Sequence, residues 1–401
     1  MMSFMRRIYL DHVAATPVSD TALRAMTTAM EKFPGNPSAI HTEGREARGV
    51  LEKARAEIAG AISAHSDEIV FTSGATEANN MAIVGVVRSA RANGVKHPHI
   101  IVSTIEHPSV LEVAHALEKE EVKVSYLPVN HFGVVSPRTL RTLITPETVL
   151  VSVMYANNEI GTIEPVIEIA KEIRHARKMN KTVYPYFHTD AVQAVNYCEL
   201  NVQRLGVDLM TISSGKIYGP RGIGALFVKR GVLNEPIFYG GEQEESRRAG
   251  TESVALAVGF SVAFAEARKM SAQEFKRVKK LRDTLTEQIL KKVPGVFING
   301  DLENSLPNIL NLSLEGVESE ALLLYLDAVG VALSGKSACK SSDSSASHVI
   351  MALDKQNEEN TGSIRFSLGR ETKSADIVYV VKEFLRIVPF LRTMNKQSDT
   401  I

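Results

Sequence analysis

The sequence has few cysteines, and this scarcity limits the kind of protein it can encode. Only Cys198 and Cys339 occur among 401 residues. Two cysteines do not make a framework of disulfide bonds, so we expect a reducing, cytoplasmic compartment. The chain also lacks an excess of either charge, because 46 Lys and Arg residues balance 46 Asp and Glu residues. This balance gives no reason to expect nucleic acid or an anionic membrane as a partner.

Long apolar runs are lacking too. No run approaches the roughly 18 apolar residues that a transmembrane helix requires. The first residues, MMSFMRRIYLDH, contain no apolar run long enough for a signal peptide. With 44% hydrophobic and 23% charged residues, the composition is that of an ordinary globular protein. The length predicts two or three domains, or one large α/β domain with a smaller satellite.

Short apolar runs alternate with helical patterns over about residues 64–228. Their β-branched and aromatic residues indicate strands. Strand–helix alternation of this kind predicts an α/β fold with a mostly parallel sheet sandwiched by helices. The expected strands are EIVFT (68–72), HIIVS (99–103), VKVSYL (122–127), VLVSVMY (149–155), VYPYFHT (183–189), LMTIS (209–213) and GALFV (224–228).

After Thr251 the pattern changes to α+β. We expect a large domain over 15–262, and a small domain formed by 1–14 and 263–401. Apolar residues at helical spacing predict most of the helices in the second region. Its expected elements are helices over 253–270, 272–293, 319–329 and 375–392, and strands over 308–314, 331–334 and 363–369.

Residues able to do chemistry follow the ends of several expected strands. In VFTSGATEANN (70–80), small residues at Ser73–Thr76 precede a helix, whose first amide groups can cradle a phosphate. An ordinary tight turn has the same pattern. Lys216 follows a strand in TISSGKIYGPRGIG (211–224). It could form a Schiff base, or it could be a surface lysine.

Three more strand ends carry His107, Asp190, and the pair Asn157 and Asn158. A histidine could stack on a planar cofactor or move a proton, and a carboxylate could pair with a protonated ring nitrogen. Helix capping and turn formation would also explain these residues. Together, however, a phosphate cradle, a stacking residue, a carboxylate and a lysine meet the needs of pyridoxal 5'-phosphate. The combination predicts this cofactor.

These motifs make the chain resemble cysteine desulfurases of the NifS/IscS type, in the class V aminotransferase family of PLP fold type I. The resemblance covers nearly the whole chain. It implies that L-cysteine is converted to L-alanine, that a persulfide forms on Cys339, and that an acceptor protein takes the sulfur. Iron–sulfur cluster assembly, tRNA thiolation and related sulfur trafficking are the implied pathways. The motifs are YLDHVAATP (9–17), GNPSAIHTEGREA (35–47), FTSGATEANN, NNEIGTIEP, KIYGPRGIGAL, SAC with a following SHV, and SIRFSLGR (363–370).

The resemblance also implies roles for single residues. Lys216 matches the lysine that binds the cofactor aldehyde, His107 the stacking histidine that serves as acid and base, and Cys339 the nucleophile. Arg365 and Asn36 match residues at the substrate carboxylate. The other cofactor-binding matches are Ala75, Thr76 and Ser213 for the phosphate, Asp190 for the pyridinium nitrogen, Asn158 and Gln193 for the phenolate oxygen, and Thr251 for the phosphate of the other subunit of a homodimer.

The chain departs from the family pattern around the expected phosphate. Gly215 stands where the family usually has a histidine that supports the phosphate. Glu242 and Glu245 replace a glycine and an arginine. Acidic side chains are unfavourable beside a phosphate unless Arg247 or Arg248 offsets them.

A further departure is Lys336, which replaces a glycine three residues before Cys339. Its ammonium could lower the pKa of the thiol, or it could be a solvated lysine with no role. Cys198 has no matching role, and we interpret it as a packing residue. Two alternatives stay open: a selenocysteine lyase-like enzyme, and a weakened homologue that serves as a scaffold for sulfur-acceptor proteins.

Overall fold

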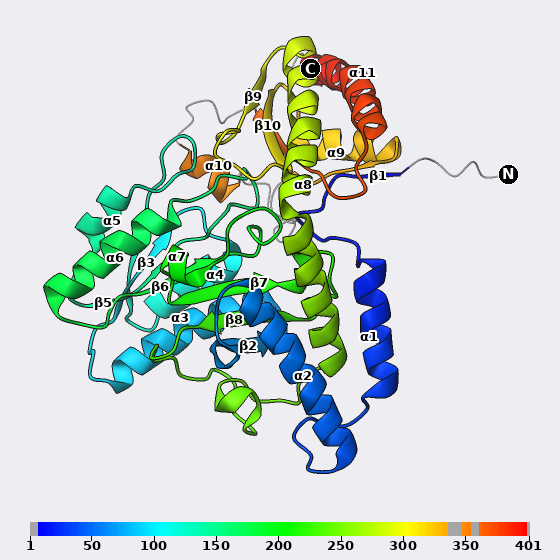
Figure 1. Cartoon of the computed structure of the whole chain (residues 1–401). Helices are drawn as coiled ribbons and strands as arrows, with labels where there is room; N and C mark the ends of the chain where they lie inside the picture. Colours follow the sequence, from blue (N-terminus) through cyan, green and yellow to red (C-terminus); the bar gives the residue numbers. More distant parts are fainter. Residues whose placement is uncertain (1–6, 336–346, 354–360, 399–401) are drawn as a thin grey trace.

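The computed structural model describes residues 7–335, 347–353 and 361–398. A larger α/β part and a smaller α+β part are joined by the long helix α8 (Val254–Lys292), as Figure 1 shows. Lys336 and Cys339 lie outside the described residues. None of the described helices is both long and apolar enough to cross a membrane.

A seven-stranded sheet forms the centre of the larger part. Its strands are β2 (Ile69–Thr72), β3 (His99–Ser103), β4 (Lys123–Leu127), β5 (Thr148–Ser152), β6 (Tyr186–Asp190), β7 (Leu209–Ser213) and β8 (Gly224–Val228). The order is β2-β8-β7-β6-β5-β3-β4. Pairing is parallel from β4 to β7, whereas β8 runs antiparallel to both of its neighbours. The predicted mostly parallel sheet is therefore confirmed, and the carboxyl ends of β2 to β7 share one edge.

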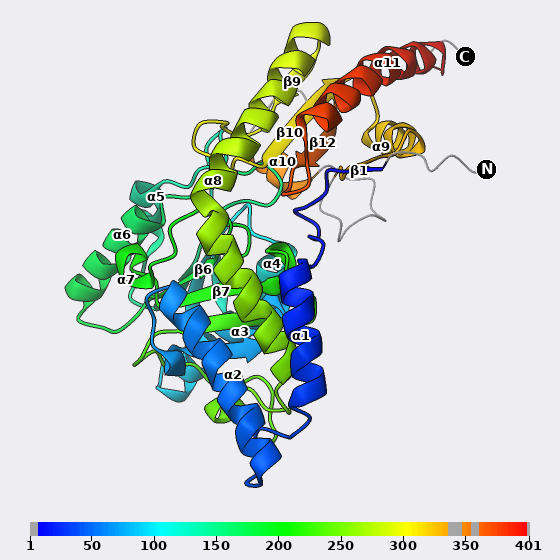
Figure 2. The same ribbon diagram turned by 45° about the vertical axis from the view of Figure 1, so that its right-hand side comes forward.

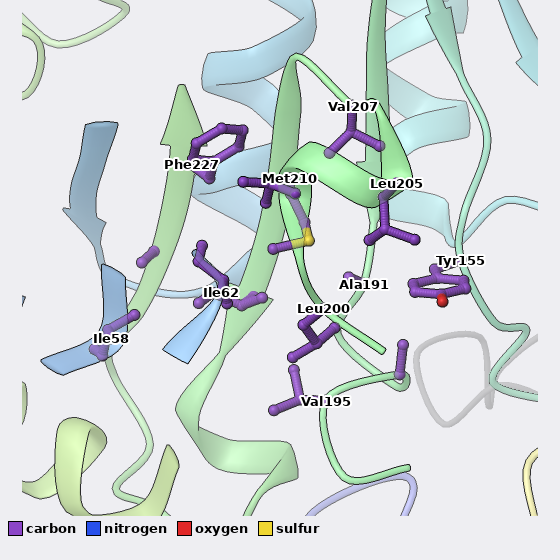
Figure 3. Packing of buried hydrophobic residues seen from close by; sticks show 14 of the residues in the cluster. Ile58, Ile62, Tyr155, Ala191, Val195, Leu200, Leu205, Val207, Met210 and Phe227 are labelled. Atoms are coloured by element: carbon purple, nitrogen blue, oxygen red, sulfur yellow. The ribbon is translucent and has the colours of Figure 1, made fainter. Parts of the chain in front are cut away.

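Helices cover both faces of this sheet because successive strand side chains point to opposite sides. In β8, Leu226 belongs to one apolar core with α3 (Ala75–Ala92) and α4 (Pro108–Glu118). The next residue, Phe227, belongs to a second core with α2 (Thr42–Ala61) and α6 (Val166–Asn180). Figure 3 shows Phe227 and Met210 in this second core together with Ile58 of α2 and Ile62.

Shorter elements complete the larger part. Helix α1 begins where Ser19 Oγ accepts a hydrogen bond from the amide of Ala22, the N-cap arrangement that a serine favours. Figure 2 shows α1, α2 and the lower half of α8 side by side. The elements are α1 (Asp20–Lys32), α5 (Pro137–Leu143), α7 (Val202–Leu205) and the 3₁₀ turns η1 (Ser66–Glu68), η2 (Ser214–Lys216) and η3 (Gln243–Ser246).

The smaller part has its own apolar core, formed by the upper half of α8, two small sheets, α9 and α11. One sheet is antiparallel, in the order β12-β10-β9, and the other is a parallel pair of β1 and β11. The elements are β1 (Ile8–Tyr9), β9 (Val296–Ile298), β10 (Ile309–Glu315), α9 (Ser319–Ala328), β11 (Val331–Ala332), β12 (Thr361–Ser367) and α11 (Ser374–Ser398). The short helix α10 (His348–Ala352) packs instead against Ile105, Met154 and Ile160 of the larger part.

The expectation of separate helices over 253–270 and 272–293 is wrong, because α8 is one helix of 39 residues. No glycine or proline follows Phe260 before the helix ends, so nothing in the backbone interrupts it. The predicted domain boundary between residues 262 and 263 falls inside this helix. The main core still includes Ala267, and the core of the smaller part begins at Val278. The division into two domains stays a prediction.

Candidate active site

The turn between β2 and α3 has the form of an anion cradle. Gly74, at φ 155° and ψ −178°, adopts a backbone conformation that only glycine holds easily, and it precedes the first helical residue, Ala75. The first amide groups of a helix have no acceptor within it, so those of Ala75 and Thr76 can meet an anion. A Cβ on Gly224 would lie 2.9 Å from Gly74 Cα, so β8 approaches the cradle closely only because it carries glycine there.

Lys216 ends the 3₁₀ turn that follows β7, and Ser213 is the last residue of that strand. The Lys216 Nζ atom donates a hydrogen bond of 2.5 Å to the backbone oxygen of Ala14. The backbone oxygen of Lys216 accepts one from Asn196 Nδ2 at 3.0 Å. These contacts hold both ends of the lysine at the carboxyl edge of the sheet.

His107 and Asp190 occupy the same edge, after β3 and at the end of β6. His107 Nδ1 accepts a hydrogen bond from the amide of Ser109, so His107 also caps α4, as the capping alternative expected. Asp190 Oδ1 accepts from the amide of Val192 at 3.0 Å. Its Oδ2 accepts from Asn79 Nδ2 at 2.8 Å.

The charges of these residues interact. Burial lowers the pKa of His107, Lys216 and His348 lower it further by repulsion, and Asp190 opposes the shift. Such effects require proximity, because Coulomb energies fall with distance. The structure therefore brings His107, Asp190 and Lys216 together, as the strand-end argument predicted, and adds His348 of α10.

Arg365 of β12 connects the smaller part to this edge. It is 2% exposed, its Nη1 donates to the backbone oxygen of Asn158 at 3.0 Å, and its Nη2 forms an ion pair of 2.9 Å with Asp11. The neighbouring Asn157 forms a turn, with its Oδ1 accepting from the amides of Glu159 and Ile160. The turn alternative thus holds for Asn157, while Asn158 is fixed through its backbone.

The remaining predicted residues lie in different places. Gln193 Nε2 donates to the backbone oxygen of Val13 at 3.3 Å, one residue from the acceptor of Lys216. Asn36 is exposed in the connection between α1 and α2, where its Oδ1 accepts from the amide of Ser38. This connection and β12 lie at opposite ends of the molecule (Figure 2). Within one chain, therefore, Asn36 does not join Arg365.

The sequence patterns did not predict the buried carboxyl group that precedes His107 in the chain. Glu106 is 0% exposed, and its Oε1 accepts from Ser103 Oγ and from the amide of Met154, both at 2.6 Å. Burial raises the pKa of Glu106 to about 8, although both hydrogen bonds oppose the shift. Its backbone oxygen lies 2.9 Å from His348 Nε2.

Comparison with known proteins identifies the family. The family described as aminotransferase class-V matches residues 8–380. The chain belongs to this family. It is 45% identical to the cysteine desulfurase IscS of Dictyoglomus turgidum over 390 residues, covering 97% of this chain and 96% of the relative.

Solved structures agree with this assignment. A NifS-like protein is 33% identical, with a TM-score of 0.88, and the similarity covers 96% of this chain and 100% of that protein. A structure described as SspA in complex with cysteine is 30% identical, with a TM-score of 0.75 and coverage of 90% and 99%. The predicted fold, that of PLP fold type I enzymes, is confirmed.

The departures from the family pattern have local explanations. A Cβ on Gly215 would lie 3.2 Å from Arg221 Cγ, so the arginine side chain packs where a larger residue would extend. Glu245 forms an ion pair of 3.2 Å with Arg247, and Glu242 is exposed. Arg247 therefore offsets the negative charge of Glu245, as expected.

The ion pairs continue beside the cradle. Arg248 binds Glu77 at 2.7 Å, and Glu77 accepts in turn from the amide of Ser73 at 2.8 Å. The predicted packing role of Cys198 is consistent with its contact with the main core. Burial raises the pKa of its thiol to about 12, which makes the thiolate scarce at neutral pH.

Proposed function

We propose that this chain is a pyridoxal phosphate-dependent cysteine desulfurase. The observation that carries the proposal is the meeting of His107, Asp190 and Lys216 beside an anion cradle, in a chain 45% identical to a cysteine desulfurase. The proposed products are L-alanine and a persulfide on Cys339. A protein acceptor then takes the sulfur, in iron–sulfur cluster assembly, tRNA thiolation or a related pathway, and the proposed location is cytoplasmic.

The residues present fit the cofactor. The helix-start amides of Ala75 and Thr76, with Ser213, suit its phosphate, and Asp190 suits its ring nitrogen. Lys216 suits its aldehyde, the face of the His107 ring suits stacking, and Asn158 and Gln193 suit its ring oxygen. When bound, the cofactor supplies an electron sink for the α-carbon of the substrate.

Arg365 is suited to hold the substrate carboxylate. Its guanidinium carries five N–H donors. Two of its nitrogens contact Asn158 and Asp11. The third, Nε, is buried and has no hydrogen-bond partner within 7–335, 347–353 and 361–398. A carboxylate would satisfy this donor and orient the α-carbon towards the cofactor site.

His107 is suited to proton transfer because its lowered pKa keeps the ring neutral near pH 7. In the sulfur step, the Cys339 thiolate attacks the substrate sulfur, so the S–S bond forms as the C–S bond breaks. The bonding electron pair stays with the alanine fragment, and a proton on that fragment completes L-alanine. Ser347, the first described residue after Cys339, donates from its Oγ to Glu159 Oε2 at 2.5 Å.

A homodimer completes the proposed site. Thr251 is exposed within its own chain, as is Asn36. A second subunit would let Thr251 reach the phosphate, and Asn36 the substrate carboxylate, of its partner.

The test is product release by the purified protein, supplied with L-cysteine and a reductant. We expect equal amounts of sulfide and L-alanine, together with a visible absorbance band from the bound cofactor. Cys339→Ala should keep the absorbance and lose sulfide release, whereas the matched control Cys198→Ala should keep both. Normal sulfide release by Cys339→Ala would disprove the assignment of the nucleophile. A colourless protein that takes up no added cofactor would disprove the proposed function.

A further inference from the structure

A chain of hydrogen bonds joins Asp190 to His107 through two helices. Asn79 of α3 donates from Nδ2 to Asp190 Oδ2 and to Ser109 Oγ, both at 2.8 Å. Ser109 of α4 places its Oγ 2.8 Å from His107 Nδ1. Asn79 and Ser109 are both buried, at 0% and 8% exposure.

The direction of each hydrogen bond follows from the acceptor at one end. The Asp190 carboxylate oxygen accepts, so the amide nitrogen of Asn79, and not its oxygen, faces it. The second proton of this amide group goes to Ser109 Oγ. The hydroxyl proton of Ser109 is then available to His107 Nδ1, to which the Ser109 amide also donates at 3.1 Å. Two donors therefore point at Nδ1.

We propose that Asn79 and Ser109 are positioning residues that hold His107 as a neutral imidazole with its proton on Nε2. A proton on Nδ1 would face the amide N–H of Ser109, and it would force the Ser109 hydroxyl proton away from this nitrogen. The ring nitrogen on the far edge, Nε2, is left for the bound cofactor or substrate. The catalytic meaning of this inference rests on the proposed function.

The surrounding charges also favour a neutral His107, with the exception of Asp190. Lys216 and His348 disfavour a cationic His107, as does burial, whereas Asp190 favours it. Glu106, the preceding residue, has a raised pKa and so contributes little negative charge near pH 7. The hydrogen bonds decide which nitrogen carries the proton, a choice that these charges do not make.

The inference predicts the ¹⁵N resonances of the histidine rings in the holoenzyme. In the wild-type protein at neutral pH, Nδ1 of His107 should be unprotonated and Nε2 protonated, with the signals assigned by their loss in His107→Asn. Asn79→Leu removes the donor to Ser109. Ser109→Ala removes the hydroxyl donor to the ring and keeps the backbone amide donor. Each should populate the Nδ1–H form and raise the apparent pKa of His107 by about 0.5–1 unit, the effect of one ordinary hydrogen bond.

Two controls separate positioning from general damage. Ser109→Thr keeps the hydroxyl and should restore the wild-type spectrum. Asn93→Asp changes an exposed asparagine at the other end of α3 and should leave His107 unchanged. An Nδ1–H ring in the wild-type protein would overturn the inference, as would wild-type spectra in both Asn79→Leu and Ser109→Ala. If Asn79→Leu does not fold, the wild-type and Ser109→Ala spectra still test the inference.

The spectra do not depend on turnover, so the two proposals can fail separately. Sulfide release measured on the same samples tests the proposed function. A wild-type protein with the predicted tautomer but no sulfide release would contradict the function alone. Full sulfide release with an Nδ1–H ring would contradict the inference alone.

Discussion

Glu106, the residue before His107, has an ionisable side chain in the interior of the protein. It is fully buried, and burial raises its pKa from 4.5 to about 8. The folded protein therefore holds this proton at pH values where the unfolded chain has released it. Stability should fall as pH rises from about 4.5 to about 8, because the unfolded state binds fewer protons in this window.

The pH dependence can be tested by replacing the carboxyl group with an amide. Glu106→Gln keeps the oxygen that accepts from Ser103 and Met154, but it has no proton to lose. Between pH 6 and pH 8 the wild type should lose about 2 kcal/mol more stability than this variant. Thermal unfolding midpoints at both pH values measure the difference. The control Glu118→Gln changes an exposed carboxyl group and should show the same pH dependence of stability as the wild type. An equal pH dependence of Glu106→Gln and wild type would contradict the account.

At this scale the sequence predicted residues that follow strands better than residues on helices. His107, Asp190 and Lys216 could be expected together because the ends of parallel strands share one edge. Asn79 and Ser109 could not, since they meet only after α3 and α4 pack side by side. The sequence carried no signal for Glu106, and only the fold shows that it is buried and bonded to Ser103 and Met154.

At the scale of elements, the turn η3 has an unusual backbone. Three successive non-glycine residues, Glu244, Glu245 and Ser246, have φ values of 48°, 56° and 62°. Such conformations are costly unless the surroundings impose them. Glu244 supplies the restraint, with two hydrogen bonds of 2.6 and 2.8 Å from Arg55 and one of 2.9 Å from the amide of Phe71.

Removing this anchor should destabilise the turn and the fold together. Glu244→Ala removes the buried partner of Arg55, a loss that typically costs about 3–5 kcal/mol. The half-exposed Glu52, 3.2 Å from Arg55 Nε, remains and offsets only part of it. The matched change Glu245→Ala removes only an exposed ion pair, worth about 0–1 kcal/mol. Thermal or urea unfolding compares the two variants. A loss for Glu244→Ala no larger than that for Glu245→Ala would show that the anchor is unimportant.

The elements themselves were predictable where the local signal was complete. The expected strands over 99–103, 209–213 and 224–228 agree with β3, β7 and β8 at both ends. The strand expected over 183–189 starts later, at Tyr186, and ends at Asp190. The long α8 was divided wrongly, because a change in apolar pattern near residue 270 marks a change of core and not the end of a helix.

At the scale of the whole molecule, the proposed homodimer makes each site depend on two chains. Thr251→Ala should weaken cofactor binding in the site of the partner subunit. Lys216→Ala should remove the covalent attachment in the site of its own subunit. A heterodimer of the two variants, isolated by different affinity tags, should contain one intact site. Its cofactor absorbance should be about half that of the wild type. A heterodimer with no such absorbance would contradict the sharing of Thr251 between subunits.

The most direct test of the central claim is peptide mass spectrometry after exposure to L-cysteine without a reductant. The account predicts one added sulfur atom on the peptide that contains Cys339, none on the peptide that contains Cys198, and no added sulfur in Lys216→Ala. Sulfur on Cys198, or on Cys339 in the absence of Lys216, would contradict it.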